Sequence, residues 1–580
     1  MYLNLQNLAD SFEYRENSIY SKMYDGERYV SITYGTFYKN IRAITNYLQE
    51  ISKLNKGDKC AIMSENRPEW MMMYFGIVYN GIIAVPCDAM LSLEEVKNII
   101  RNSGVEVMGV SLNIYEKLIK DLEIVSLIKE WIVFDYCTTL KDTTNTISFK
   151  EILKQATNTS TSFIKNELKR SDLASLIYTS GTTGDPKAIM LSNGNFMHQA
   201  NNLWQSARLV EQDVILSVLP LHHTFQFAVE LTLFAIGGTI AYADSIKPTR
   251  LIDVIKTTEV TVMIGIPTLY AKILDGIHRN LTQLKFPIKQ IVQLLLKISE
   301  LSYFITGNHK TGKKILAFLR KKAGLDTVKY MISGAAPLSH SVAKGYAVLG
   351  FNLANGYGLT EASPVISVGD PLGPIDNKSV GNAIMNVSWK IADPDSSGVG
   401  EICIKGENVM QGYFNDMEST AMVLTNDGWL KTGDMGYIGT KKGREYLYIT
   451  GRYKNIIVTG GGKNVYPEEI EEFINTHAYI LESIVIGVSV ADNDMSEVPC
   501  ALIVLDMLKL TEEDIDPNSS QIKEIINTHL RTVNTKLQTY QKIRGYEIRQ
   551  EELEKNTTRK IKRFEYKGHK FRHLLSKHFH

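Results

Sequence analysis

The chain has 580 residues, more than one hydrophobic core can serve, so two or more domains are expected. Its 44% apolar and 22% charged residues exclude a disordered or collagen-like chain. A formal net charge of +1 argues against a protein-wide attraction to nucleic acid, and no nucleic-acid partner is expected.

The cysteines and the N-terminus indicate in which cellular compartment the protein resides. Cysteines occur without Cys-x-x-Cys spacing, at Cys60, Cys87, Cys137, Cys403 and Cys500. This spread disfavours a zinc site or a disulfide framework. Residues 1–10 are too polar for a signal peptide, and the apolar stretch 225–243 is interrupted by polar residues and glycines. We therefore expect a cytoplasmic protein.

Short β-type runs alternate with helical patterns from about residue 33. Residues 58–63 (DKCAIM) predict a buried strand, residues 70–80 an amphipathic helix, and residues 81–86 (GIIAVP) the next strand. The alternation recurs around residues 214–219, 260–264 and 329–333. Strands that alternate with helices indicate a parallel sheet covered on both faces, so the body is predicted to be α/β.

Beyond about residue 381 the pattern changes to short alternating strands, such as residues 400–405 (GEICIK). This pattern predicts an antiparallel sheet or a small β-barrel-like subdomain appended to the body. A compact α+β segment begins at residues 464–474. We expect a large N-terminal domain of residues 1–451 and a small C-terminal domain of residues 452–580.

The most informative stretch is residues 176–187, LIYTSGTTGDPK. An apolar strand runs into a loop of hydroxyl side chains and glycines that ends in a lysine. Glycines permit close backbone approach, hydroxyls donate hydrogen bonds and lysine supplies charge, which suits a polyphosphate. A Walker P-loop would end in Gly-Lys-Ser/Thr, whereas Pro186 precedes Lys187 and Ala188 follows it.

Further motifs follow in a fixed order: LPLHHTF at 219–225, SGAAPL at 333–338, NGYGLTE at 355–361, DGWLKTGD at 427–434, and a glycine-rich stretch from Gly451. Together with residues 176–187, this series resembles the adenylate-forming superfamily, which includes acyl-CoA synthetases, nonribosomal-peptide adenylation domains and luciferases. The resemblance covers nearly the whole chain. It implies an α/β N-terminal domain followed by a mobile α+β C-terminal domain.

The resemblance implies a nucleotide site for ATP. Glu361 would hold Mg²⁺, which wants hard oxygen ligands. Tyr357 would stack on adenine, and the carboxylate of Asp434 would accept from both ribose hydroxyls, together with Arg452. The nucleotide-binding residues implied are Thr179, Ser180, Gly181, Thr182, Thr183, Gly184, Lys187, Gly334, Ala335, Ala336, Asn355, Gly356, Tyr357, Gly358, Thr360, Asp434 and Arg452.

The resemblance also implies an acyl pocket and a path for coenzyme A. The substrate-binding residues implied are His222, His223, Phe225, Gly334 and Gly358. Because adjacent residues of an extended loop point to different sides, one of the two histidines is expected to face the pocket. The coenzyme A path would be lined by Gly460, Gly461, Gly462 and Lys463, and Lys454 would be the hinge residue.

The catalytic lysine of the family lies in a Gly-Lys-Ile-x-Arg context. This chain reads TRKIKR at 558–563, with Arg559 where glycine is usual. The register favours Lys560 as the catalytic lysine, and Lys562 is the competitor. Thr179, Glu361 and Lys560 are the catalytic residues implied; they would position two anions and neutralise their charge.

The implied function is ATP-dependent activation of a fatty acid to acyl-AMP, followed by thioester formation with coenzyme A. Residues 285–325 carry nine Lys/Arg and one acid among apolar runs, which resembles long-chain enzymes and suits contact with anionic lipid. A peripheral contact with the inner face of the membrane is therefore a further expectation, with a solvated helical hairpin as the alternative. An acyl carrier protein as acceptor and a catalytically silent lipid-binding scaffold also stay open.

Overall fold

The computed structural model describes residues 1–580 except 136–144, 159–164, 180–186, 374–375, 377, 442, 462, 490–495, 556–560, 567–568 and 577–580. The described chain forms two compact units. The first comprises Met1–Trp389, Ile404–Leu430 and Thr440–Tyr446. The second comprises Lys390–Cys403, Lys431–Gly439 and Leu447–His580.

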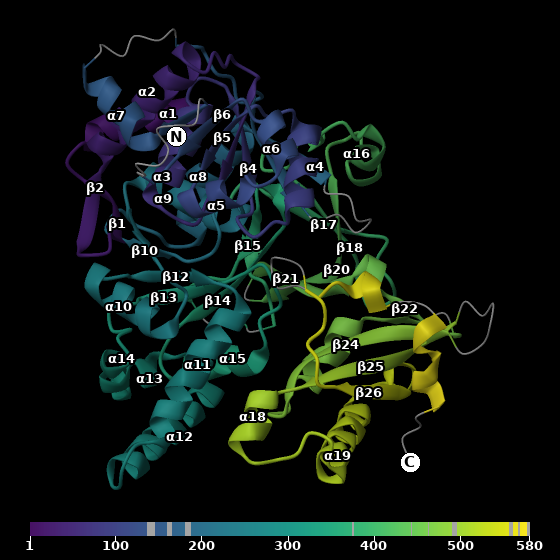
Figure 1. The fold of residues 1–580 in the computed structure, drawn as a ribbon. Helices are drawn as coiled ribbons and strands as arrows, with labels where there is room; N and C mark the ends of the chain where they lie inside the picture. The colour runs from purple at the N-terminus through teal and green to yellow at the C-terminus, as the bar shows by residue number, and fades with distance from the viewer. Residues whose placement is uncertain are drawn as a thin grey trace. The chain divides into compact units, whose positions relative to one another are not determined.

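The first unit contains a nine-stranded sheet whose interior strands run parallel (Figure 1). Its edges are antiparallel pairs, β14 with β15 and β1 with β2. In spatial order the strands are β16 (Asn382–Ala383), β15 (Val365–Val368), β14 (Leu353–Gly358), β13 (Tyr330–Ser333), β12 (Val262–Gly265), β10 (Val214–Ser217), β11 (Thr239–Tyr242), β1 (Ile19–Tyr24) and β2 (Tyr29–Thr33).

The second large sheet of this unit has eight strands and is also parallel in its interior, from β4 through β3 and β5 to β6. In spatial order the strands are β19 (Gly412–Tyr413), β9 (Lys187–Ser192), β8 (Leu173–Thr179), β4 (Ile83–Cys87), β3 (Lys59–Met63), β5 (Val107–Val110), β6 (Glu130–Val133) and β7 (Thr146–Ser148). Successive residues of β4, β3 and β5 are buried on both faces of the sheet, as expected for strands with helices on both faces.

Helices cover the two sheets. They are α1 (Leu5–Asp10), α2 (Tyr34–Glu50), α3 (Pro68–Val78), α4 (Leu93–Ser103), α5 (Leu112–Leu118), α6 (Leu122–Leu127), α7 (Phe149–Asn158), α8 (Asn193–Ser206), α9 (Thr224–Ile236), α10 (Pro248–Thr258), α11 (Pro267–Thr282), α12 (Ile288–Thr306), α13 (Lys310–Ile315), α14 (Ala317–Lys322), α15 (His340–Val348) and α16 (Met417–Val423).

Three of these helices, α3, α8 and α9, lie between the two sheets (Figure 1). Helices α3 and α9 are buried on nearly every side, which explains why their sequences are apolar all round. The Phe227 ring of α9 meets Tyr74 of α3 and Phe196 of α8, with centroids 4.4 and 5.1 Å away. Burial of each such ring contributes about 1.5–3 kcal/mol. Helix α9 stops at Gly237, whose φ of +88° suits glycine.

A four-stranded sheet follows, with order β17 (Ser388–Ala392), β18 (Gly400–Lys405), β20 (Leu430–Lys441) and β21 (Arg444–Arg452). The division between the two units passes through this sheet. The rest of the second unit contains β22 (Ile457–Val458), β23 (Asn464–Val465), α17 (Pro467–Ile474), β24 (Ile480–Ser489), β25 (Glu497–Leu505), α18 (Met507–Glu512), α19 (Ser520–Lys536) and β26 (Gly545–Arg549).

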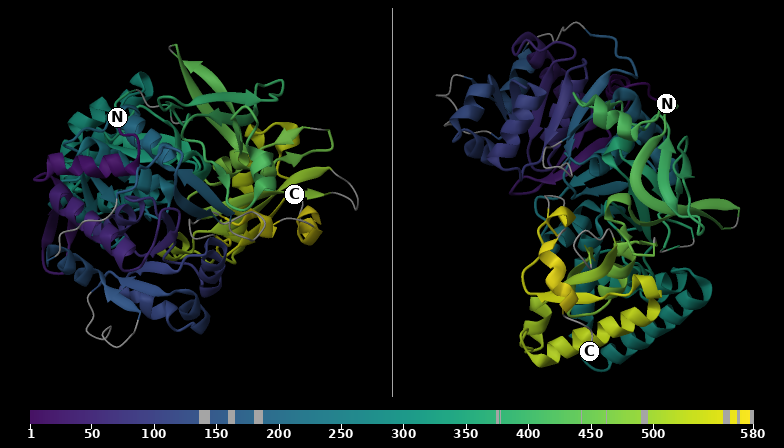
Figure 2. Two further views of the ribbon diagram at one scale, coloured as in Figure 1. Left: turned by 90° about the horizontal axis from the view of Figure 1, so that it is seen from above. Right: turned by 90° about the vertical axis from the view of Figure 1, so that its right-hand side faces the viewer.

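Strands β24, β25 and β26 form the sheet of the second unit, and α19 packs along it (Figures 1 and 2). Ile470 and Ile474 of α17 belong to the same apolar cluster. Helix α19 buries Ile522, Ile526, Leu530 and Val533, which recur every three or four residues and so share one face. A second apolar cluster covers the other face of the sheet and includes Leu553. The unit therefore has an α+β core of its own.

The predicted α/β class and the smaller α+β C-terminal part are confirmed. The predicted strands at 58–63, 81–86 and 329–333 are β3, β4 and β13, and the predicted helix at 70–80 is α3. The amphipathic character predicted for this helix is wrong, because α3 lies between the two sheets and is buried on nearly every side. By compactness the second unit takes in Lys390–Cys403 and Lys431–Gly439 as well, because these segments pair in the four-stranded sheet. The domain limits at residue 451 and the hinge at Lys454 stay predictions. Over the described ranges, no helix combines the length and apolarity that a membrane span needs.

Candidate active site

The strands on either side of the hydroxyl-rich loop, β8 and β9, pair as an antiparallel hairpin. Thr179, at the end of β8, pairs with Lys187, at the start of β9, in antiparallel register. The loop between them includes the predicted nucleotide residues Ser180, Gly181, Thr182, Thr183 and Gly184, which lie outside the described residues. The pairing brings the two ends of the loop together, although the sequence did not reveal that β9 returns antiparallel.

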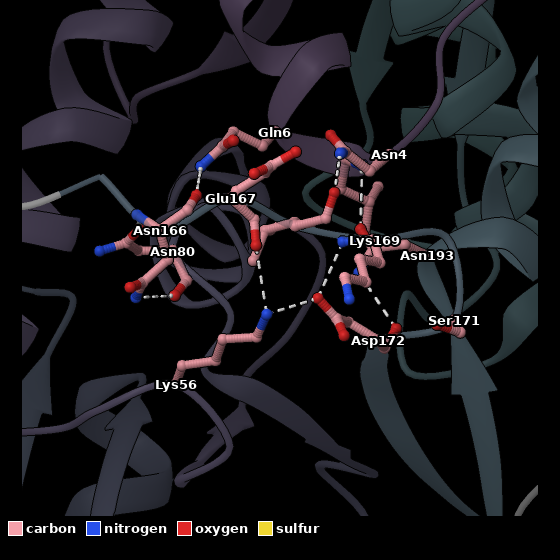
Figure 3. A network of polar contacts seen from close by, with 12 residues as sticks. Asn4, Gln6, Lys56, Asn80, Asn166, Glu167, Lys169, Ser171, Asp172 and Asn193 are labelled. Carbon is pink, nitrogen blue, oxygen red and sulfur yellow. Dashed lines mark hydrogen bonds and ion pairs between the residues drawn. The ribbon is translucent and has the colours of Figure 1, made fainter.

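A polar network fixes the base of this hairpin (Figure 3). Asp172, just before β8, receives hydrogen bonds from Lys56 Nζ at 2.6 Å and from the Lys169 N–H at 2.8 Å. Burial by itself would raise the pKa of Asp172, but these hydrogen bonds outweigh it and lower the pKa below its ordinary value. The Asp172 carbonyl accepts from the N–H of Asn193, just after β9, at 3.0 Å. Both strands of the hairpin are thus held at one point.

The same network anchors the segment that leads into the hairpin. Asn4 donates to the Leu168 carbonyl at 2.7 Å, and the Asn166 N–H donates to Asn80 Oδ1 at 2.6 Å (Figure 3). Lys56 also donates to the Glu167 carbonyl at 3.2 Å. Segments far apart in the chain therefore converge on the start of β8, which gives the loop a rigid base.

Lys187, at the end of the loop, and the carboxylate of Glu361 both contact Tyr413. The Lys187 ammonium contacts Ser419, lies 3.7 Å from Asp416 Oδ2, and sits 5.0 Å from the centroid of the Tyr413 ring. The Tyr413 hydroxyl donates to Glu361 Oε1 at 3.0 Å. Burial and the Glu361 carboxylate raise the pKa of Tyr413, so its hydroxyl stays a donor. Tyr413 thus links the predicted metal ligand to the predicted phosphate lysine.

The ends of β13 and β14 combine close packing with unsatisfied polar atoms. Ser333 and Asn355 are cross-strand partners. The Ser333 hydroxyl and Asn355 Oδ1 are buried, and neither has a hydrogen-bond partner among the described residues. A Cβ on Gly358 would lie 1.9 Å from the Pro364 carbonyl oxygen, and one on Gly334 would lie 2.8 Å from the Phe225 ring. Because neither glycine has a side chain, the Pro364 backbone packs directly on Gly358 and the Phe225 ring directly on Gly334.

Other predicted nucleotide residues lie on the same elements. Ala335, just after β13, has a φ of +68°, a strained value for a residue with a Cβ. Gly356 and Tyr357 belong to β14, and Thr360 begins the short 3₁₀ turn that carries Glu361. Ala336 follows Ala335 in the turn after β13. The structure thus brings the two motifs at 333–338 and 355–361 to neighbouring strands.

His222 and His223 lie in the turn before α9, with ring centroids 4.1 Å apart. His222 is the more buried, and its Nε2 lies 3.4 Å from Asp88 Oδ2. Asp88 directly follows β4 of the other sheet. One ligand atom each of Asp88, His222 and His223 lie within 4.8 Å of one another, so this group has the chemistry to hold a transition metal. Phe225 is the predicted acyl-pocket residue that packs on Gly334.

In the second unit, Arg452 Nε donates to Asp434 Oδ1 at 2.9 Å. Asp434 is nearly buried, whereas the Arg452 side chain is 57% exposed. The predicted ribose pair is therefore preassembled by a charge-assisted hydrogen bond. Lys454 lies in a single 3₁₀ turn directly after β21.

The glycine-rich stretch forms the turn between β22 and β23. The Thr459 N–H donates to the Lys463 carbonyl at 3.0 Å, which closes the turn. A Cβ on Gly461 would meet no described residue within 4 Å, and one on Gly460 would lie 3.2 Å from Ser496. Gly462 lies outside the described residues.

Lys560 lies outside the described residues, as do residues 556–559, whereas Lys555 and Ile561 on either side of this gap are described. Lys555 and Ile561 form an antiparallel bridge, and the Lys562 N–H donates to the Glu554 carbonyl at 2.8 Å. Arg563 forms an ion pair with the buried Glu471. The described residues on either side of Lys560 are therefore paired with each other, and Arg563 is anchored in the interior of the unit.

The sequence of the chain matches the model of one known protein family. Residues 12–414, well over half of the 580 residues, match the sequence model of the family described as AMP-binding enzyme. The chain belongs to the AMP-binding enzyme family. All the predicted nucleotide and acyl-pocket residues of the first unit fall inside the matched range, whereas Asp434, Arg452 and Lys560 fall after it.

Two curated proteins have related sequences. The long-chain-fatty-acid–CoA ligase ACSBG2 of Gallus gallus is 28% identical over 478 residues, which span 79% of this chain and 62% of the chicken protein. The long-chain-fatty-acid–[acyl-carrier-protein] ligase AEE15, chloroplastic, of Arabidopsis thaliana is 29% identical over 496 residues, 74% of this chain and 67% of the plant protein. This chain thus spans less than two thirds of the chicken relative.

A solved structure with the same fold is the anthranilate CoA ligase AuaEII in complex with anthranoyl-AMP. It superposes with a TM-score of 0.76 at 21% sequence identity, covering 97% of this chain and 96% of that chain. At this identity the likeness concerns the fold, which agrees with the α/β class and its smaller C-terminal part.

Within this AMP-binding enzyme, sequence reasoning missed three residues that contact the predicted site. Tyr413 holds Glu361, Asp88 lies beside His222, and Asn66 donates to the Leu219 carbonyl at 2.6 Å and so fixes the turn before the histidines. Asp88 carries a usable signal, because a polar residue directly after a buried parallel strand lies at the edge where sites form. Tyr413 carries no such signal in the sequence, because it lies in β19, an edge strand of only two residues.

Proposed function

We propose that this chain is an acid–thiol ligase that activates a fatty acid, long-chain by preference, with ATP and then forms a thioester with coenzyme A. In the first step the fatty carboxylate attacks the α-phosphorus of ATP, so that acyl-AMP forms and pyrophosphate leaves. In the second step the thiolate of coenzyme A attacks the acyl carbonyl and AMP leaves. The observation that carries the proposal is the Glu361–Tyr413–Lys187 cluster beside the hydroxyl-rich hairpin.

The residues present fit a bound nucleotide. The Ser333 hydroxyl and Asn355 Oδ1 are buried without partners among the described residues, which is costly unless a ligand supplies a hydrogen bond. Gly334 and Gly358 leave no space for a side chain. We assign adenine to Tyr357 and this backbone, the ribose to Asp434 and Arg452, and the phosphates to Lys187, Thr179 and the loop that follows Thr179.

The chemistry requires two anions to meet, so positioning and charge neutralisation supply most of the catalysis. Glu361 would hold Mg²⁺, which neutralises phosphate charge when bound. Tyr413 keeps the Glu361 carboxylate oriented, and Lys187 adds a fixed positive charge. Lys560 is assigned to the α-phosphate because Ile561 and Arg563 are both fixed, which supports the Gly-Lys-Ile-x-Arg register. Lys454 is the proposed hinge residue, and the turn at 460–463 the proposed coenzyme A path.

A fatty acid as substrate is supported by the two curated relatives, both named for long-chain fatty acids. We assign the acyl pocket to His222, His223 and Phe225. Phe225 packs directly on Gly334, so the ring and the glycine would meet the reacting end of the acid. A cytoplasmic location is supported by the buried free cysteines of the described chain.

An acyl carrier protein is the second candidate acceptor, favoured by the name of the Arabidopsis relative. One experiment separates the candidates: AMP formation by the purified protein with acids from acetate to oleate, each with and without coenzyme A. AMP and thioester that appear together with long acids support the proposal. ATP–pyrophosphate exchange without thioester points to a carrier protein, and no turnover with any acid contradicts both and favours a silent lipid-binding scaffold.

A further inference from the structure

Helix α12 exposes an apolar stripe along its whole length. Ile291, Leu294, Ile298, Leu301 and Ile305 are spaced three or four residues apart, so they share one side of the helix. Their side chains are 45–72% exposed. Phe286 and Phe304, near the two ends of the helix, are more exposed still. A helix of this length spans about 28 Å. Monomeric proteins rarely expose so large a contiguous apolar surface without a use for it.

The exposed stripe does not attach α12 to the body, because a different side of the helix makes those contacts. Val292 and Ser299 are buried, and the Ser299 hydroxyl donates to the Val348 carbonyl of α15 at 2.6 Å. Glu300 pairs with Lys344 of α15 at 2.7 Å. Figures 1 and 2 show α12 as a long rod that extends away from the strands of the nine-stranded sheet. The exposed stripe is therefore available to a partner.

The surroundings of the stripe are strongly basic. Residues 285–325 contain nine Lys/Arg and a single acid, Glu300, which Lys344 neutralises. Arg320 is buried and donates to backbone carbonyls, so it serves the fold. The exposed cations of the segment are Lys285, Lys297, Lys310, Lys313, Lys314, Lys321 and Lys322. Phe318 of α14 is also exposed among them.

We propose that α12 lies flat on an anionic bilayer, with Ile291, Leu294, Ile298, Leu301 and Ile305 entering the acyl boundary and the lysines of α13 and α14 binding the headgroups. An apolar helical stripe flanked by lysines is the pattern of an interfacial helix. A second copy of this chain is a poorer occupant. A symmetric contact through α12 would place one basic segment against its own equivalent, where like charges repel.

The chain can dock through α12 whether or not it catalyses the proposed reaction. The advantage of docking, however, rests on the proposed function. Long-chain fatty acids partition into bilayers, so an enzyme held at the surface collects its substrate there. Short acids dissolved in water gain nothing from docking. The two claims can therefore fail separately.

The experiment is co-sedimentation of the full chain with vesicles that mix phosphatidylglycerol and phosphatidylcholine. We expect wild type to bind these vesicles, and to bind pure phosphatidylcholine far less. The triple variant Leu294→Gln, Ile298→Gln, Leu301→Gln should bind at least about tenfold more weakly, because its apolar side chains no longer enter the bilayer. Lys313→Gln with Lys314→Gln should weaken binding about fivefold per lysine and reduce its dependence on salt.

A matched control is Leu122→Gln, Met417→Gln, Leu508→Gln, which changes three residues that are 80–88% exposed elsewhere in the chain. Its vesicle binding should equal that of wild type. Both triple variants should keep the far-ultraviolet circular dichroism of wild type and its AMP formation with octanoate. Only the α12 variant should lose activity on oleate delivered in anionic vesicles.

The proposal is wrong if wild type does not bind anionic vesicles, or if the α12 variant binds them as well as wild type. Sedimentation velocity adds a third arm: a wild-type dimer that the α12 variant dissociates, with no vesicle binding by either, assigns the stripe to a second copy. Vesicle binding by a protein that forms no AMP with any acid would leave the docking surface intact and contradict the proposed reaction alone.

Discussion

The Tyr413 hydroxyl donates to the Glu361 carboxylate at 3.0 Å. The Lys187 ammonium lies over the same ring, 5.0 Å from its centroid. One tyrosine from an edge strand thus contacts both the residue assigned to Mg²⁺ and the lysine assigned to phosphate. This contact gives the first of four predictions.

Tyr413→Phe should lower kcat/KM for AMP formation by about tenfold, the value of one hydrogen bond to a charged group. It should also raise the Mg²⁺ concentration needed for half-maximal rate, because Glu361 loses the donor that orients it. Titration of Mg²⁺ in the AMP-forming assay measures both effects. Tyr14→Phe, at a fully exposed position, is the control and should be silent. An unchanged Mg²⁺ dependence would remove Tyr413 from the site.

Lys560→Ala should reduce ATP–pyrophosphate exchange by about 100-fold or more, because a positive charge on the transition state is lost. ATP binding should remain, and so should thioester formation from supplied acyl-AMP. Lys562→Ala is the matched control. Its backbone N–H already serves the base of the loop, and its exchange rate should stay close to that of wild type. The reverse pattern would show that the register is shifted by two residues.

Gly461→Leu should slow thioester formation by at least about tenfold while ATP–pyrophosphate exchange stays unchanged, if the turn at 460–463 lines the coenzyme A path. Among the described residues, nothing lies within 4 Å of a Cβ at Gly461, so the substitution should not disturb folding. The same change at Gly276, which is also open, should leave both steps unaffected. Equal loss of both steps in Gly461→Leu would argue against this path.

Glu230 of α9 gives a prediction about pH. Burial raises the pKa of Glu230 to about 7, although hydrogen bonds from Ser217, Gln226 and Tyr242 oppose this. Between the unfolded pKa of about 4.3 and this folded value, the folded state keeps a proton that the unfolded state has lost. The free energy of unfolding of the first unit should therefore fall as pH rises through this window and level off above it.

Glu230→Gln should abolish this fall and be the more stable protein at pH 8 by about 3–4 kcal/mol. Urea titrations at several pH values, followed by tryptophan fluorescence, measure the effect. All five tryptophans belong to the first unit, so the signal reports on that unit. The exposed Glu524→Gln should behave as wild type. Parallel pH profiles for wild type and Glu230→Gln would contradict the prediction.

Much of the fold was predictable because its signals are local. Residues 58–63 and 81–86 are continuous apolar runs between turn residues, which is what a buried parallel strand requires, and they are β3 and β4. The loop before Lys187 suits a polyphosphate by its residue types, and the family resemblance favours that role, which stays a prediction. The antiparallel return of β9 could not be predicted, because a lysine after Pro186 can begin either a helix or a strand.

The sequence by itself determined the α/β class and, through its series of motifs, the relationship to the AMP-binding enzyme family. The roles it implies for the hydroxyl-rich loop, Glu361 and Asp434 stay predictions. Only the tertiary structure decided which residues meet. Tyr413 reaches Glu361, and Asp88 reaches His222, across more than fifty residues of sequence in the first case and more than a hundred in the second. It also decided that the apolar residues of α12 face outward, because a helical pattern fixes which side chains share a face but not which face the body covers.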